Sequence, residues 1–310
     1  MLPPARELPS LRRSLLAWYD ARGRSLAIRE PGLEPWAVLV AEVMAQQTQV
    51  GRVEAAWRAF LRRFPDPVAL AEASPADAIR AWRGLGYNRR VMGLQRAAVD
   101  IVAAGGRVPD DPADLERLPG VGPYTARAVV ATAYGRPAAA VDVNVGRVLG
   151  RLVVGDSHAL GRRDAPGAAD RLLDRGRPAD WNHALMDLGA LVCRPVAPAC
   201  GECPLRPWCR HAARARPAAI AAVKPATPER GPAPVRFEAT TRWLRGRIVD
   251  RLRSAPPGAW VAIDSPLGEH SAADVATALR GLVADGLVER NAFGRARLPV
   301  DPPRLLGGSR

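Results

Sequence analysis

The chain has 310 residues, enough for two or three domains, and a formal net charge of +14. So large a positive charge favours an anionic polymer as the binding partner. No apolar run reaches the length of a membrane span, since even Ala37–Ala45 is interrupted by Glu42, so we exclude membrane insertion.

Through residue 213 the sequence is a succession of helical patterns separated by proline and glycine, without strand alternation. The expected helices are Leu8–Tyr19, Trp36–Gln46, Gly51–Phe64, Pro67–Glu72, Pro75–Gly84, Asn88–Ala104, Asp111–Leu118, Pro123–Ala133, Val143–Leu152, Gly167–Asp174 and Asp180–Cys193. This pattern predicts an all-α fold for residues 1–213.

The pattern changes after residue 213. Residues 214–236 are rich in proline and are expected to form an extended linker. Residues 237–300 then show two helices, Thr240–Arg253 and one capped by Ser271 that runs to Asp285, and a hairpin with strands Leu287–Arg290 and Arg295–Leu298. This order predicts a small α+β, winged-helix-like domain, followed by a tail at 301–310. Such a domain can bind nucleic acid or serve only for packing and protein contacts, and the sequence leaves both open.

All four cysteines lie in one short stretch, as Cys193-x6-Cys200-x2-Cys203-x5-Cys209. Four thiols so close together suit one metal centre, either a [4Fe–4S] cluster or a structural zinc. A zinc ribbon would normally show two Cys-x-x-Cys knuckles and here there is one, so we favour iron–sulfur. Disulfides are the least favoured alternative, because no signal peptide is recognisable and a chain of this size does not need them. We therefore expect a reducing, cytoplasmic location.

A second motif is Leu118-Pro-Gly-Val-Gly-Pro-Tyr-Thr-Ala126, which places two glycines between two helices. Glycine lets the backbone turn tightly and leaves bare N–H groups at the start of the following helix, where the helix dipole also favours an anion. A lone Gly-x-Gly turn is weak evidence, because helix connections often contain glycine. The Leu-Pro prefix and the Tyr-Thr-Ala helix start strengthen the prediction of a phosphate-binding hairpin. The residues expected to contact phosphate are Gly120, Val121, Gly122 and Thr125.

Two carboxyl groups stand in contrasting settings. Asp142 precedes a helical pattern, so its simplest role is an N-cap, but a helix start also keeps a carboxylate ionised, which suits a group that stabilises a cation. Glu42 interrupts an apolar helix, where burial would raise its pKa and favour the protonated acid; a buried structural hydrogen bond is the alternative. One charged and one protonated carboxyl is a known division between electrostatic stabiliser and general acid.

Together these motifs resemble the helix-hairpin-helix (HhH-GPD) DNA glycosylases, and among them the MutY-type, A/G-specific adenine glycosylases. The resemblance covers about Leu8 to Arg210, and its motifs are the four cysteines with Glu42-Val-Met-Ala-Gln-Gln-Thr-Gln49, Gly84-Leu-Gly-Tyr87, Leu118-Pro-Gly-Val-Gly122, Val141-Asp-Val-Asn144 and Met186-Asp-Leu-Gly189. It implies two helical lobes with DNA between them. One would be a six-helix barrel of residues 26–118, and the other a cluster-bearing lobe of residues 1–25 and 119–213.

The resemblance also implies a role for each site residue. Glu42 would protonate the departing adenine and help activate water, and Asp142 would stabilise the oxocarbenium-like sugar with help from Tyr124 and Asn144. Gln46, Gln47 and Tyr87 would contact DNA near the extruded base. The four cysteines would hold a [4Fe–4S] cluster.

The implied partner is double-stranded DNA with a mismatched or damaged base, bound in base excision repair. We expect a monomer that is cytoplasmic and associated with the nucleoid when on DNA. A related branch, the endonuclease III type, cleaves the strand with a hairpin lysine. Here that position is Tyr124 and the one lysine, Lys224, lies in the linker, so we predict a monofunctional glycosylase without lysine-dependent lyase activity.

The sequence departs from the adenine-glycosylase pattern at three places. Ala27-Ile28 replaces Pro-Trp, Ala45 replaces a leucine, and Asn88 replaces an aromatic residue. Weaker packing at Ala45 and weaker stacking at Asn88 predict poorer discrimination of 8-oxoguanine from guanine opposite the adenine. The C-terminal region does not resemble the Nudix-like domain of many family members.

Two other functions stay open. A mismatch-specific thymine or uracil glycosylase shares the scaffold and differs mainly in the base pocket. A non-catalytic iron–sulfur DNA-binding regulator is disfavoured, because Glu42, Tyr124, Asp142 and Asn144 are all present.

Overall fold

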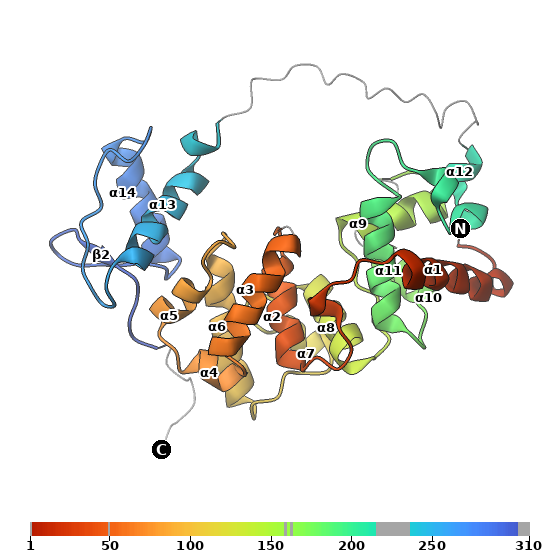
Figure 1. Ribbon diagram of the computed structural model, residues 1–310, viewed down its shortest axis with the longest axis horizontal. Coiled ribbons are helices and arrows are strands. Elements are labelled where there is room, and N and C mark those ends of the chain that lie inside the picture. The colour runs from red at the N-terminus through yellow and green to blue at the C-terminus, as the bar shows by residue number, and fades with distance from the viewer. Residues whose placement is uncertain (1, 49, 158–159, 162–163, 215–235, 303–310) are drawn as a thin grey trace. The chain divides into compact units, whose positions relative to one another are not determined.

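The structure is a computed structural model that describes residues 2–48, 50–157, 160–161, 164–214 and 236–302. The chain divides into two compact units (Figure 1). The first contains residues 1–35, 110–113 and 122–231, and the second contains residues 36–109, 114–121 and 232–310. Nearly all of the expected linker 214–236 and most of the tail 301–310 fall outside the described residues.

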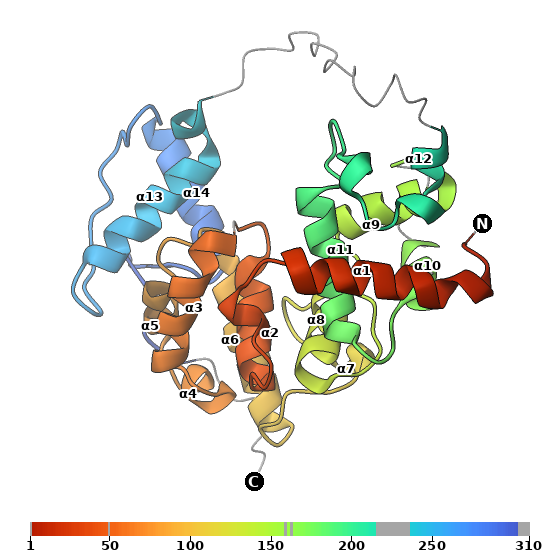
Figure 2. The ribbon, with the colours of Figure 1, turned by 45° about the vertical axis from the view of Figure 1, so that its right-hand side comes forward.

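The first unit is helical. Its helices are α1 (Leu8–Arg22), α8 (Pro123–Tyr134), α9 (Val143–Leu149), α10 (Asp164–Leu172), α11 (Pro178–Leu191) and α12 (Arg210–Arg214), with a π-helical turn at Gly150–Val154 and 3-10 turns at Ala5–Glu7, Ala27–Arg29, Cys200–Glu202 and Arg206–Trp208. Helix α11 is central, because it packs against α1, α8 and α9 (Figure 2). The segment expected to be one helix, Val143–Leu152, is α-helical up to Leu149 and continues as the π-helical turn.

The second unit begins with a compact set of helices. These are α2 (Pro35–Ala45), α3 (Val50–Arg63), α4 (Pro67–Ala71), α5 (Pro75–Ala81) and α6 (Arg89–Ala103), and α7 (Pro112–Glu116) has residues in both units. Helix α6 packs against α4 and α5. Helix α2 is apolar on almost every side, which fits a helix enclosed by others.

The C-terminal part of the second unit is the expected helix, helix and hairpin. It contains a 3-10 turn (Phe237–Ala239), α13 (Thr241–Ser254), α14 (Ala272–Ala284), β1 (Glu289–Arg290) and β2 (Ala296–Arg297). The strands pair antiparallel, with Val261 bridged to Ala296. Both strands are shorter than expected. Leu287, Val288 and Leu298, which were expected within them, are buried but lie outside the paired segment. The mainly α fold with a small strand-containing C-terminus is confirmed.

Local signals account for the ends of these helices. Ser271 and Asp274 form a reciprocal capping box at the start of α14. Gly135 ends α8 in the left-handed conformation, with φ of 61°. No helix in the described ranges is both long and apolar enough to cross a membrane.

A buried ion-pair cluster joins α11 to the segment after α1. The side chain of Asp187 is fully buried and accepts hydrogen bonds from the Arg24 backbone N–H at 2.8 Å, from Arg24 Nε at 2.8 Å and from Arg29 Nη1 at 3.0 Å. Burial alone would raise the pKa of Asp187, but the hydrogen bonds and charges of Arg29 and Arg24 outweigh it and hold that pKa below its usual range. Asp187 is therefore an anion whose charge is fully compensated in the folded chain.

Replacing Asp187 with Asn should destabilise the first unit by about 3 kcal/mol or more, because it leaves two arginines in a largely buried site without their counter-charge. Asp180→Asn on the same helix is the control, since its partner Arg177 is well exposed and the change should cost less than about 1 kcal/mol. Because the folded pKa of Asp187 is lowered, its contribution is complete above its unfolded value of about 4 and is lost as the pH falls further. Urea unfolding at neutral pH and near pH 3.5 should therefore show a difference between wild type and Asp187→Asn that shrinks in acid; a difference that grows would contradict this account.

Candidate active site and cysteine loop

Glu42 is the one residue of the helical stretch Trp36–Met44 that is not fully buried. Every other residue of Trp36–Met44 in α2 is buried, whereas Glu42 is partly exposed. The expectation of a buried carboxyl is thus met only in part, because Glu42 keeps partial exposure while its helical neighbours are buried.

The segment after α2 brings two predicted DNA-contacting elements together. Gln46 Nε2 donates to the carbonyl oxygen of Gly120 at 3.4 Å, so the end of α2 contacts the glycine hairpin within the second unit. Gln47 is exposed and has a φ of 53°, a left-handed conformation that is unfavourable for a residue with a side chain. Tyr87 also has a positive φ, of 43°, and its side chain is 39% exposed.

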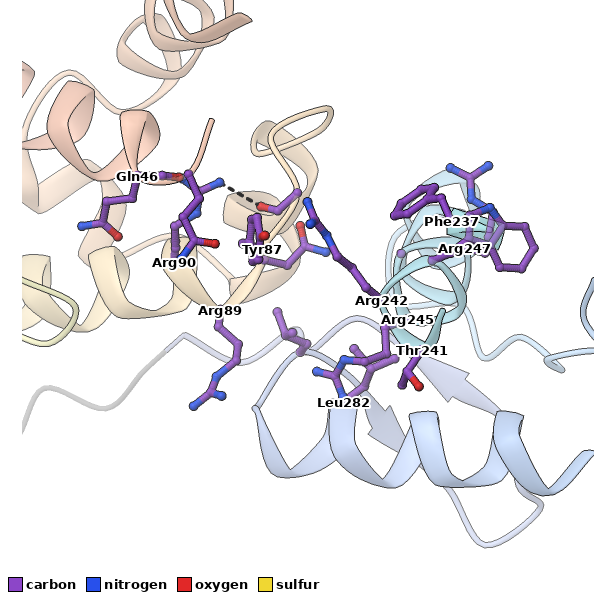
Figure 3. Close-up of a pocket in the computed structure, with 16 residues that line it drawn as sticks. Gln46, Tyr87, Arg89, Arg90, Phe237, Thr241, Arg242, Arg245, Arg247 and Leu282 are labelled. Atoms are coloured by element: carbon purple, nitrogen blue, oxygen red, sulfur yellow. Dashed lines mark hydrogen bonds between the residues drawn. The ribbon is translucent and has the colours of Figure 1, made fainter. Parts of the chain in front are cut away.

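Arg90 holds both of these strained residues, and sequence reasoning missed it. Its Nη1 donates to the carbonyls of Val43 at 3.1 Å, Met44 at 2.9 Å and Gln46, and its Nη2 donates to the carbonyl of Leu85 at 2.9 Å. The guanidinium therefore ties the end of α2 to the loop that carries Tyr87 (Figure 3). Strained backbone of this kind persists only where the surroundings determine it, and Arg90 supplies that constraint.

The glycine hairpin has the expected backbone but fewer available side chains. Gly120 has a φ of 84°, and a Cβ added at Gly93 would come within 3.5 Å of its Cα, so the hairpin packs tightly on α6. Gly122 is the N-cap of α8. The side chains of Val121 and Thr125 are buried, with Thr125 only 2% exposed, so any DNA contact at these two residues would have to come from the backbone.

Asp142 is the N-cap of α9, as expected. Its Oδ1 accepts from the backbone N–H of Val145 at 2.7 Å, and its Oδ2 accepts from Asn144 Nδ2 at 3.0 Å. The structure thus joins two of the predicted catalytic residues by a hydrogen bond. Tyr124, at the start of α8, is half-buried and donates to Met186 Sδ at 3.3 Å. Glu42 belongs to the second unit and Asp142 to the first.

A second arginine connects Asn144 to the cysteine loop. Arg147 Nη2 donates to Asn144 Oδ1 at 3.0 Å and to the carbonyl of Gly189 at 2.7 Å, and its Nε donates to the carbonyl of Cys193 at 2.9 Å. A Cβ on Gly189 would lie 2.9 Å from the Cβ of Asn144, so only glycine fits at that point of α11. Asp142, Asn144, Arg147 and Cys193 therefore form one hydrogen-bonded chain.

The four cysteines line a single small cavity in the first unit, together with Arg151 and Arg206. Arg151 Nη1 donates to Cys193 Sγ at 3.4 Å and to the carbonyl of Arg194 at 2.7 Å. In the described part of the chain, no three His, Cys, Asp or Glu side chains are arranged to hold a single metal ion.

Burial affects the protonation of these thiols. It raises the pKa of Cys203 to about 12 and also raises the pKa of Cys200 and Cys209. A thiolate, which is the form that binds metals, is thus unfavourable here unless a positive charge is supplied. Two neighbouring arginines supply part of it, and an all-thiolate donor set fits a cationic metal centre.

Comparison with known proteins agrees with this arrangement. A sequence profile described as the HhH-GPD superfamily of base excision DNA repair proteins matches residues 40–161. The chain is 42% identical over 294 residues to an adenine DNA glycosylase of Mycobacterium tuberculosis, covering 92% of each chain. It is 40% identical over 216 residues to the adenine DNA glycosylase of Homo sapiens, covering 66% of this chain and 40% of that protein.

Solved structures show the same fold. A thermostable thymine-DNA glycosylase matches with a TM-score of 0.64 and 26% identity, covering 68% of this chain and 98% of that one. A trapped covalent intermediate of endonuclease III with DNA matches with a TM-score of 0.57 and 24% identity, covering 69% of this chain and 98% of that one. At such identity the second match shows the fold alone.

Arg90→Lys should loosen both segments that Arg90 joins, because one ammonium group cannot replace the fork of the guanidinium. Each carbonyl left unsatisfied costs about 1–3 kcal/mol, so we expect amide hydrogen exchange in residues 44–48 and 84–88 to accelerate by roughly tenfold or more. Arg89→Lys is the matched control, since the Arg89 side chain is 76% exposed and its ion pair with Asp285 involves neither segment. Equal exchange rates in Arg90→Lys and wild type would show that the two segments keep their conformations without the Arg90 guanidinium.

Proposed function

Because the chain belongs to the HhH-GPD superfamily of base excision DNA repair proteins, we propose that it is a DNA glycosylase that hydrolyses the N-glycosidic bond of a mismatched adenine. The adenine would be opposite 8-oxoguanine or guanine. The observation that carries the chemistry is the carboxylate of Asp142, held by a helix start and by Asn144. The choice of adenine is supported by the similarity, over 92% of the chain, to a named adenine DNA glycosylase.

Asp142 acts on the sugar. Loss of a base leaves positive charge on the deoxyribose, and a fixed anion lowers the free energy of that state. The backbone N–H of Val145 and the amide of Asn144 each donate to the carboxylate and fix its orientation. Asn144 is in turn fixed by Arg147, so the carboxylate does not have to reorganise during the reaction.

Glu42 acts on the base. A departing adenine leaves more readily once it is protonated, and Glu42 is a partly buried carboxyl on an apolar helix, a setting that suits a general acid. After base departure the same group, now ionised, helps to activate the attacking water. The residues that contact the opened duplex lie close to Glu42 in the fold. Gln46 and Gln47 directly follow its helix, and Tyr87 lies in the loop that Arg90 ties to the end of that helix.

We assign no lysine-dependent strand cleavage to this enzyme. Tyr124 stands where the strand-cleaving branch has a lysine, and a phenol cannot form a Schiff base with the sugar. The product is then an intact strand with an abasic site. We further propose that the protein acts as a monomer in the cytoplasm, bound to mismatch-containing duplex DNA.

The cysteine loop holds a [4Fe–4S] cluster in this proposal. Four thiols line one cavity, and their spacing contains a single Cys-x-x-Cys knuckle rather than the two of a zinc ribbon, which favours a polynuclear cluster over a lone zinc. When bound, the cluster supplies positive charge that keeps the thiols ionised and fixes the loop. The Cys193 carbonyl, which Arg147 binds, would thereby be fixed as well.

Asp142→Asn should lower the single-turnover rate of adenine release from A:8-oxoguanine and A:G duplexes by about 100-fold or more, because it removes the charge and leaves an equally good N-cap. Asp66→Asn is the matched control, since Asp66 caps α4 by accepting from the Ala69 N–H at 2.8 Å, and it should keep the wild-type rate. Strand breaks should appear only after alkali treatment. A near wild-type rate for Asp142→Asn on every releasable base would mean that Asp142 is only a cap, and faster release of thymine or uracil opposite guanine would replace the adenine assignment.

Protein purified without oxygen should be brown and contain iron and acid-labile sulfide with little zinc. Cys200→Ser should lose most of the cluster and bind DNA more weakly, because the loop loses one of the four ligands that order it. Metal analysis and absorption spectra test this directly. Colourless protein with one zinc per chain would refute the cluster.

A further inference from the structure

The C-terminal domain is docked on the helices of the second unit through a buried arginine. Arg253, in α13, is only 7% exposed. Its Nε donates to the carbonyl of Ile79 at 2.9 Å, its Nη2 to Asn88 Oδ1 at 2.7 Å and its Nη1 to Asp250 Oδ1 at 2.9 Å. A guanidinium that is buried and bonded on both sides of an interface fixes the orientation of the two surfaces it joins.

Asn88 has a partner in this arrangement that explains its identity. Asn88 is the N-cap residue of α6, yet its side chain makes no cap hydrogen bond and is used by Arg253 instead. A side chain without an acceptor at this position, such as phenylalanine, would leave Nη2 without this hydrogen bond. The departure from the adenine-glycosylase pattern at Asn88 thus coincides with a contact to the C-terminal domain.

Docking places α13 beside the loop that carries Tyr87. A pocket of about 640 Å³ lies between them, lined by Gln46, Gln47, the start of α6, α13 and Phe237 (Figure 3). Its charged lining residues in the described part of the chain are all arginines, namely Arg89, Arg90, Arg242, Arg245 and Arg247. An arginine-lined pocket with aromatic rings is complementary to nucleic acid, whose phosphates are anionic and whose bases stack.

The distribution of charge within the domain selects α13 rather than α14 as the basic helix. Arginines of α13 are Arg242, Arg245, Arg247, Arg251 and Arg253, whereas α14 has Arg280 alone. Insertion of α14 into a DNA groove would therefore bring little positive charge to the phosphates. Three of the α13 arginines, Arg242, Arg245 and Arg247, line the pocket that also contains Tyr87.

Two of the α13 arginines are available for a ligand. Arg242 lies over the ring of Tyr87, with its guanidinium carbon 4.1 Å from the ring centroid, and is not paired with any carboxylate among the described residues. Among the residues that the structure describes, Arg247 pairs with Asp250 of its own helix. The Arg247 side chain is about half exposed, so this ion pair contributes little in water. Arg245 is less available, because Asp285 holds it in a partly buried pair.

We propose that docked α13 is a second DNA-binding element, in which Arg242 and Arg247 bind phosphates of the strand contacted by Tyr87 and Gln47. Arg253, through Asn88, is the positioning residue that keeps α13 beside that strand. The proposal rests on DNA as the substrate of the proposed function, but it does not depend on which base is released.

The test is the salt dependence of binding to an undamaged duplex, measured by fluorescence anisotropy with the full-length protein. Affinity falls as salt rises, so the slope of log affinity against log salt concentration is negative. Removing one arginine–phosphate interaction should make this slope shallower by about 0.9, and the double variant Arg242→Gln with Arg247→Gln should make it shallower by about 1.8. Arg251→Gln is the matched control, because Arg251 is on the same helix, pairs with Asp264 and does not line the pocket. A slope in the double variant equal to that of Arg251→Gln would overturn the proposal and leave the pocket to a protein partner.

The positioning role is tested from both sides of the docking contact. Arg253→Met and Asn88→Ala should each make the salt slope shallower, toward that of the double variant, while the helix content stays unchanged. Neither change should make the slope shallower still when it is added to the double variant. Asn88→Ala keeps the test valid if Arg253→Met does not fold, because the Asn88 side chain makes no cap hydrogen bond in α6. Folded Asn88→Ala protein with a wild-type slope would refute the positioning role.

These results are separable from the proposed function. Undamaged duplex has no base to release, so its binding slope does not depend on the chemistry of Glu42 or Asp142. If adenine release fails but the slopes change as expected, the function is wrong and the inference stands. If adenine is released and the slopes of the double variant do not change, the inference is wrong and the function stands.

Discussion

The contacts of Arg90 with backbone carbonyls are the interaction on which the predicted DNA-binding surface of the second unit depends. Burial lowers the pKa of Arg90, yet an arginine stays protonated in proteins, so its charge must be satisfied by acceptors. It finds them on the end of α2 and on the loop before α6. These contacts constrain the backbone on either side of Gln47 and before Tyr87, the two residues with left-handed conformations.

In the first unit an arginine likewise fixes the surroundings of Asp142. Arg147 binds Asn144 on one side and the carbonyl of Cys193 on the other, so the orientation of the carboxylate depends on the cysteine loop through successive hydrogen bonds. In both units an arginine bonded to main-chain oxygens fixes a polar group of the candidate site. Main-chain acceptors suit this role because they move only if the surrounding helices move.

The C-terminal domain extends the same principle to a domain interface. Arg253 bonds to the carbonyl of Ile79 and to Asn88, next to Tyr87 in the chain. A small domain attached in this way adds the arginines of α13 to the second unit. It also gives Asn88 a physical role that its position in a motif did not suggest.

The sequence by itself determined the helices, the N-caps and the spacing of the four cysteines, because these depend on residues within a few positions of each other. Ser271 with Asp274, and Asp142 with Val145, are local pairs of this kind. It could not show that Glu42 is only partly buried, or that the side chains of Val121 and Thr125 are covered, because burial depends on which helices pack together. Nor could it separate Arg90, Arg147 and Arg253 from the other arginines, since their acceptors are mostly main-chain oxygens distant in sequence, and only the tertiary structure brings them within hydrogen-bonding distance.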